Sequence, residues 1–79
     1  MEVLLFGIAR EIVGETRLTI SPEENVETVG DLKKQLKQRF PELQRLSSMV
    51  VAVDAEYAND EQLLSPGSEV ALIPPVSGG

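Results

Sequence analysis

Apolar residues near the start of the chain follow two patterns that are typical of strands. Residues 3–8 form an unbroken apolar run, which is typical of a central strand covered on both faces. Residues 16–20 alternate polar and apolar positions, as a half-buried strand does. Residues 9–13 predict a short helical turn or a wide loop that ends at Gly14, which tolerates positive φ. The short connection favours antiparallel pairing of the two strands.

The clearest helical pattern lies over residues 28–40. Four apolar residues recur at helical spacing and form one stripe: Val29, Leu32, Leu36 and Phe40. Thr28 is a good N-cap, and Asp31 three residues later completes a variant of the capping box. Pro41 predicts the end of the helix, because a proline disfavours the α conformation in the residue before it.

The second half of the chain predicts two or three further strands. Residues 49–53 form another continuous apolar run, and residues 69–73 are expected to form the last strand. Residues 54–56 indicate a turn, with residues 57–58 as a short return strand.

Two local features are expected between these strands. We expect Asn59 to cap a single helical turn that buries Leu63 and Leu64. Residues 65–68 predict a type II turn, because proline and glycine occupy its two central positions.

The order of elements, β-β-α-β-(β)-β, predicts an α+β fold. One main helix packed on one face of a mixed four- or five-stranded sheet is the ubiquitin-like β-grasp. The ferredoxin-like alternative needs a second full helix, and residues 54–68 are too short and broken to supply one. We expect one domain over residues 1–73 and an extended, flexible tail over residues 74–79.

Composition narrows the chemistry that this domain can carry. The 79 residues include no cysteine and no histidine, which excludes catalytic triads and zinc fingers and leaves no metal site to expect. A net charge of −6 and only three aromatic residues disfavour nucleic acid. No apolar run approaches the ~18 residues of a membrane helix, and no signal-peptide pattern opens the chain. We therefore expect a soluble cytoplasmic protein that acts through a surface or a chain end.

The predicted sheet leaves one apolar face without a helix. The first and last strands carry apolar residues on both faces, and exposed apolar area on a small domain usually marks a partner site. Loops or a homodimer contact are the plain alternatives. Alternation alone does not decide which set points outward; we favour Phe6 and Ile73, and assign Val3 and Leu5 to the core. Arg10 closes the first strand beside Phe6, as a partner contact or as a solvated loop charge.

The basic residues are concentrated in one region. Five of the seven lie on or just after the main helix: Lys33, Lys34, Lys37, Arg39 and Arg45. Together with Glu27 and Asp31 at its start, they complement the helix dipole, so we assign them no binding role.

The final residues have the composition of an extended tail. Pro74 and Pro75 end strand pairing and stiffen the chain. Six extended residues span roughly 20 Å, and Gly78 and Gly79 are slim enough to carry the terminal carboxylate into a narrow channel. The alternative is a frayed end without a role.

Two segments resemble the small subunit of molybdopterin synthase, a ubiquitin-like sulfur carrier. Residues 3–11 with Gly14 form the first, and the strand-Pro-Pro-Val-Ser-Gly-Gly ending over residues 70–79 is the more specific. The resemblance spans the whole chain in length and element order. Gly7 stands where the family often has a larger residue.

This resemblance implies chemistry at the C-terminus. An activating enzyme would use ATP and Mg²⁺ to adenylate the carboxylate of Gly79, and a sulfur donor would convert it to a thiocarboxylate. The large synthase subunit would take up the tail, kept slim by Gly78, and the sulfur would pass to cyclic pyranopterin monophosphate to form the dithiolene that binds molybdenum or tungsten. Phe6, Arg10 and Ile73 would dock the partner. The chain would bind no cofactor, and two copies would join a large-subunit dimer as a heterotetramer.

The sequence is also compatible with other functions. A sulfur carrier of the same fold can serve thiamine synthesis or tRNA thiolation, and a ubiquitin-like modifier would be conjugated through Gly79 to lysines. A third possibility is an interaction module with an inert tail. The opening segment and the Pro-Pro ending favour molybdopterin synthesis.

Overall fold

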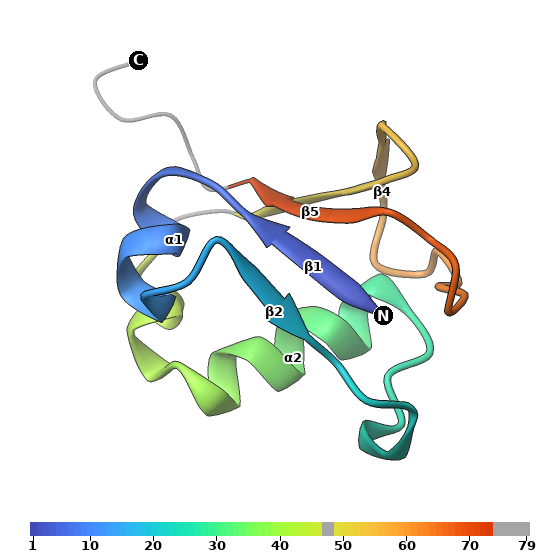
Figure 1. Cartoon of the computed structure of the whole chain (residues 1–79), viewed down its shortest axis with the longest axis horizontal. Coiled ribbons are helices and arrows are strands. Elements are labelled where there is room, and N and C mark those ends of the chain that lie inside the picture. The colour runs from blue at the N-terminus through green and yellow to red at the C-terminus, as the bar shows by residue number, and fades with distance from the viewer. Residues whose placement is uncertain (47–48, 74–79) are drawn as a thin grey trace.

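The structure, a computed structural model that describes residues 1–46 and 49–73, is an α+β fold built on one five-stranded sheet (Figure 1). Its strands are β1 (Glu2–Leu5), β2 (Arg17–Thr19), β3 (Val50–Val53), β4 (Glu56–Ala58) and β5 (Val70–Ile73). Its helices are α1 (Gly7–Val13) and α2 (Val29–Arg39), with 3-10 helices η1 (Pro22–Glu24) and η2 (Pro41–Arg45). The strands lie in the order β2-β1-β5-β3-β4. β1 and β5 are parallel and the other pairs antiparallel, which confirms the mixed sheet of the β-grasp.

Helix α2 begins at the predicted capping box. The Thr28 side-chain oxygen accepts a hydrogen bond from the Asp31 backbone N–H at 3.1 Å, and the Asp31 carboxylate accepts one from the Thr28 N–H at 3.2 Å. These bonds satisfy backbone donors that have no partner inside the helix. The helix ends at Arg39, and Phe40 is its C-cap immediately before Pro41. Both ends therefore lie where the sequence predicts them.

A single core joins the helices to one face of the sheet. Its fully buried members come from all the layers: Val3, Ala9, Val29, Leu32, Leu36, Leu43, Val51, Val70 and Leu72. Burying one such aliphatic side chain contributes about 1.5–3 kcal/mol, so this face provides most of the packing free energy. Leu5 is also buried, at 2% exposure. The assignment of Val3 and Leu5 to the core is confirmed.

The chain leaves its first strand earlier than the sequence predicts. β1 ends at Leu5, and Ile8 lies on α1 instead of continuing the strand. Helix α1 contains the short helical turn predicted over residues 9–13, so Arg10 lies inside a helix and does not close the strand. Gly7 has φ +54°, a left-handed conformation that glycine adopts without steric cost. This conformation lets the backbone change direction between β1 and α1. The continuous apolar run over residues 3–8 gives no indication of this bend. Gly14 ends α1 with φ +84°, and its N–H donates to the Arg10 carbonyl at 2.8 Å.

The segment after β4 is a hydrogen-bonded turn instead of the predicted helical turn. The predicted cap is present, because the Asn59 side-chain oxygen accepts a hydrogen bond from the Glu61 N–H at 3.0 Å. The Val29 N–H donates to the Gln62 carbonyl at 3.0 Å, and the Gly30 N–H donates to the Asp60 carbonyl at 2.9 Å. The loop therefore supplies acceptors to the first turn of α2. Leu63 forms an isolated bridge and is 70% exposed, so its predicted burial is wrong.

Two tight turns join strands in this part of the fold. At the β3–β4 hairpin Asp54 and Ala55 have φ of +51° and +68°, as in a type I′ turn. The later turn is closed by the Ser68 N–H, which donates to the Ser65 carbonyl at 2.9 Å. Gly67 does not have the left-handed φ that a type II turn requires. The type II prediction is therefore wrong.

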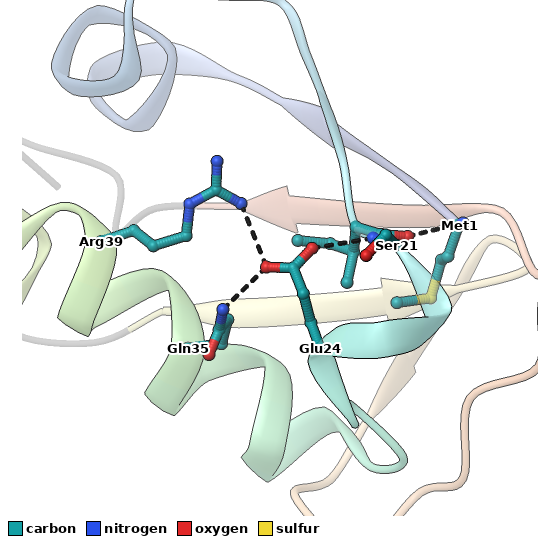
Figure 2. A network of polar contacts seen from close by, with 6 residues as sticks. Met1, Ser21, Glu24, Gln35 and Arg39 are labelled. Carbon is teal, nitrogen blue, oxygen red and sulfur yellow. Dashed lines mark hydrogen bonds and ion pairs between the residues drawn. The ribbon is translucent and has the colours of Figure 1, made fainter.

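Glu24 ties the loop after β2 to helix α2 (Figure 2). Its carboxylate accepts hydrogen bonds from the Ser21 backbone N–H and from the Gln35 amide, both at 2.8 Å. The Arg39 guanidinium lies 3.5 Å from the same carboxylate. The Met1 amino group donates to the Ile20 carbonyl at 3.0 Å beside this network. These contacts connect the segment after β2, the 3-10 helix η1 and helix α2.

These contacts lower the pKa of the Glu24 carboxyl, first through the Ser21 N–H and then through Gln35 and Arg39. The pKa of Asp31 is also lowered, mainly by the backbone N–H groups of Glu27 and Thr28. An unfolded chain titrates these groups near pKa values of about 4.3 and 3.9. A lowered folded pKa gives stability that is present above the unfolded pKa and lost as the pH falls through the folded pKa.

We predict that Glu24→Gln lowers the free energy of unfolding at pH 7 and that the difference from the parent shrinks as the pH falls through the lowered pKa of Glu24, where this carboxyl itself becomes protonated. Urea unfolding at pH 7 and pH 3 measures this difference. Glu15→Gln, at an exposed position in the loop before β2, is the matched control. An equal loss of stability at both pH values would contradict the assigned role of the charge.

We predict that Gly7→Ala destabilises the fold by about 1–2 kcal/mol, because a Cβ is strained at positive φ. Gly67→Ala is the control, since no atom lies within 4 Å of its added Cβ and its φ is not left-handed, so its change is expected within about 0.5 kcal/mol. Thermal unfolding of both variants tests the comparison. Equal stability of the two would show that the bend after β1 does not depend on glycine.

Candidate functional site

The sheet face opposite α2 carries an apolar row that crosses four strands. Directly paired residues of neighbouring strands share a face. Leu4 pairs with Ala71, Ala71 with Ala52, and Ala52 with Tyr57. Because Leu4 alternates with the buried Val3, this row points away from the core.

A second set of apolar residues lies at one end of this face. Val50 pairs with Ile73, and the parallel register of β1 and β5 places Leu5 beside Leu72. Phe6 and Ile73 follow these two residues, so they lie at the same end of the sheet. We call the combined surface the open face: Leu4, Phe6, Val50, Ala52, Tyr57, Ala71 and Ile73. Figure 1 shows the single long helix on the other side.

The expected outward set is only partly exposed. Phe6 is 49% exposed and Ile73 is half-buried, while Val3 and Leu5 face the core. Tyr57, at 79% exposure, is the most exposed large apolar residue among residues 1–46 and 49–73. The sequence predicts Tyr57 on a short strand and does not indicate a functional role for it. The register between β3 and β4 pairs Tyr57 with Ala52 and places its ring on the open face. No local sequence pattern reveals this pairing.

A pocket of about 340 Å³ lies beside this end of the sheet. Its lining comes from β1, α1 and the start of β2: Leu4, Leu5, Phe6, Arg10, Thr16 and Arg17. The Leu5 N–H donates to the Thr16 carbonyl at 2.9 Å, which holds β1 and the loop before β2 together. The structure therefore brings Phe6 and Arg10 to one pocket, although Arg10 reaches it from a helix and not from a strand end.

The family resemblance assigns the chemistry to two glycines that the structure does not describe. Gly78 and Gly79, with the rest of the expected tail 74–79, lie outside the described residues. The described chain ends at Ile73, on the open face. Within residues 1–46 and 49–73, no group of three or more metal-ligating side chains is brought together, and no helix is long and apolar enough to cross a membrane.

Comparison with known proteins places this chain in a family. The sequence model of the ThiS family matches residues 3–79. The molybdopterin synthase sulfur carrier subunit of Caenorhabditis elegans is 40% identical over 83 residues, which cover all of this chain and 96% of that protein. The subunit of the same name from Arabidopsis thaliana is 39% identical over 80 residues, covering all of this chain and 82% of that protein.

A solved structure has the same architecture. The crystal structure of SAMP1 from Haloferax volcanii matches with a TM-score of 0.73 and 30% sequence identity, over 99% of this chain and 97% of that chain. From the family match and these full-length similarities, the chain belongs to the ThiS family.

Proposed function

We propose that the chain is the sulfur carrier subunit of molybdopterin synthase. The observation that carries this proposal is the similarity, over the whole chain, to relatives that bear this name. The fold supports it, because the domain presents an apolar face and its last described strand ends on that face. The composition also supports it, since a chain without cysteine or histidine has no side chain of its own for sulfur transfer.

The proposed chemistry takes place at the carboxylate of Gly79. A carboxylate is a poor electrophile, so an activating enzyme joins it to AMP from ATP, with Mg²⁺, and releases pyrophosphate. A sulfur donor then displaces AMP at the carbonyl carbon and leaves a thiocarboxylate. The thiocarboxylate gives its sulfur to cyclic pyranopterin monophosphate, and water restores the carboxylate. ATP and Mg²⁺ act at the activating enzyme, and this chain binds neither as a resident cofactor.

The open face is the proposed docking surface for the large synthase subunit. Phe6, Arg10 and Ile73 gather at the end of the sheet where β5 ends, and Tyr57 extends the apolar area across it. Docking there leaves residues 74–79 to reach the active site of the large subunit, where the catalytic side chains lie. Two small subunits on a large-subunit dimer complete the proposed heterotetramer. A cytoplasmic location is part of the proposal, because the activating step consumes ATP.

The second candidate function is protein modification. The matching structure from Haloferax volcanii bears the name small archaeal modifier protein 1, and a modifier would join Gly79 to lysines of other proteins. Sulfur carriers for thiamine synthesis or tRNA thiolation share the same proposed terminal chemistry. Conversion of the pterin precursor by the thiocarboxylated chain with a large subunit separates these functions. Thiazole assembly without pterin conversion would support a thiamine carrier instead.

We predict that removal of Gly78 and Gly79 abolishes sulfur transfer and leaves binding to the large subunit largely intact, because docking relies on the open face. Transfer is measured as dithiolene formation from the pterin precursor, and binding is measured by titration calorimetry. Lengthening the chain by one alanine after Gly79 is the matched control, since it keeps both glycines but moves the carboxylate. Transfer retained by the shortened chain would overturn the terminal mechanism.

We predict that Phe6→Asp weakens large-subunit binding about 10- to 100-fold or more, because an unpaired carboxylate is costly to bury against an apolar partner surface. The control is Leu63→Asp, an equally drastic change at an exposed residue that is bridged to Thr28 away from the open face. Thermal unfolding verifies that both variants fold. Unchanged affinity for Phe6→Asp would show that the partner binds another surface.

A further inference from the structure

The basic residues of this acidic chain are divided between two places. Five of the seven lie on α2 or η2, where they complement the helix dipole. The other two, Arg10 and Arg17, line the same pocket beside Phe6. In a chain of net charge −6, the pocket next to the open face is thus lined by two arginines, of which Arg17 is paired with Glu2. The helix dipole of α2 does not account for them.

The strand register places Arg17 on the same side of the sheet as the open face. It pairs with Leu4 across β1 and β2, so both side chains lie on the face that points away from the core. Its guanidinium lies 3.4 Å from the Glu2 carboxylate, and the two side chains are 65% and 57% exposed. An ion pair this exposed contributes little to stability, because water screens it. Arg17 can therefore exchange Glu2 for another carboxylate at small cost.

The floor of the pocket favours an anion carried on a protein. Leu4, Leu5 and Phe6 line the same pocket as the two arginines and supply apolar contact area there. When an apolar partner surface covers the site, water leaves and the attraction between opposite charges becomes stronger. A guanidinium also forms two parallel hydrogen bonds with a carboxylate, which fixes the partner's orientation.

We propose that this pocket receives an acidic side chain of the protein that docks on the open face, and that Arg17 leaves Glu2 to bind it beside Arg10. The inference rests on the proposed function, which makes the large synthase subunit that protein. The carboxylate sets the register of docking, while the open face provides the apolar area. Arg17 is thus a specificity residue of the interface and takes no part in the sulfur chemistry.

The test is a titration of the full chain with the large subunit from the same organism, at low and at high salt. Arg17→Gln is expected to weaken binding about tenfold at low salt and to reduce its salt dependence, because a screened charge pair is lost. Arg17→Glu is expected to weaken it further. Arg45→Gln, which removes a cation from η2, is the matched control and should leave the affinity unchanged. Glu2→Gln should retain or tighten binding, since it releases Arg17.

The outcomes separate this inference from the proposed function. Rescue of Arg17→Glu by reversal of one acidic residue on the large subunit would confirm the carboxylate. If Phe6→Asp weakens binding but Arg17→Gln leaves both the affinity and its salt dependence unchanged, the pocket proposal is overturned and the docking face stands. If Arg17→Gln changes only the reaction with ATP and the activating enzyme, the pocket contacts that enzyme instead and the proposal is likewise wrong. Absence of any binding by the parent chain would overturn both.

Discussion

The parallel pairing of β1 with β5 is the contact on which the rest of the structure depends. It joins the two ends of the described chain at the centre of the sheet and places Leu5 beside Leu72. Because the two strands run in the same direction, Phe6 and Ile73 leave them at the same end. An antiparallel arrangement would separate the bend after β1 from the residue that precedes the tail. One pairing therefore sets both the centre of the core and the position from which the tail begins.

The two faces of this sheet have different roles in the fold. The inner face packs against α1 and α2 and provides the core, while the open face keeps apolar side chains beside a pair of arginines. A domain of this size buries little apolar surface. The exposed side chains of Phe6 and Tyr57 add no burial free energy to the isolated domain. A partner that covers them would explain their presence. This arrangement suits a carrier whose reactive group is a chain end and whose catalysis belongs to other proteins.

Much of the fold could be predicted because local patterns and tertiary packing agree. The capping box at Thr28, the stripe through Leu36 and the alternation after Glu15 all specify the observed elements. The bend at Gly7 was hidden, since an apolar run does not reveal the single left-handed residue that ends it. Leu63 was misplaced because its backbone pairs with the start of α2, a long-range contact without a local signal. The arrangement of Tyr57 and Arg17 on the open face also required the register between strands.

The most direct test of the central claim is the mass of the C-terminal peptide after incubation with an activating enzyme, ATP, Mg²⁺ and a sulfur donor. The account predicts exchange of one carboxylate oxygen of Gly79 for sulfur, and no exchange when ATP is left out. An unchanged terminal peptide, or attachment of Gly79 to lysines of other proteins in place of the exchange, would contradict the assignment of this chain as a sulfur carrier.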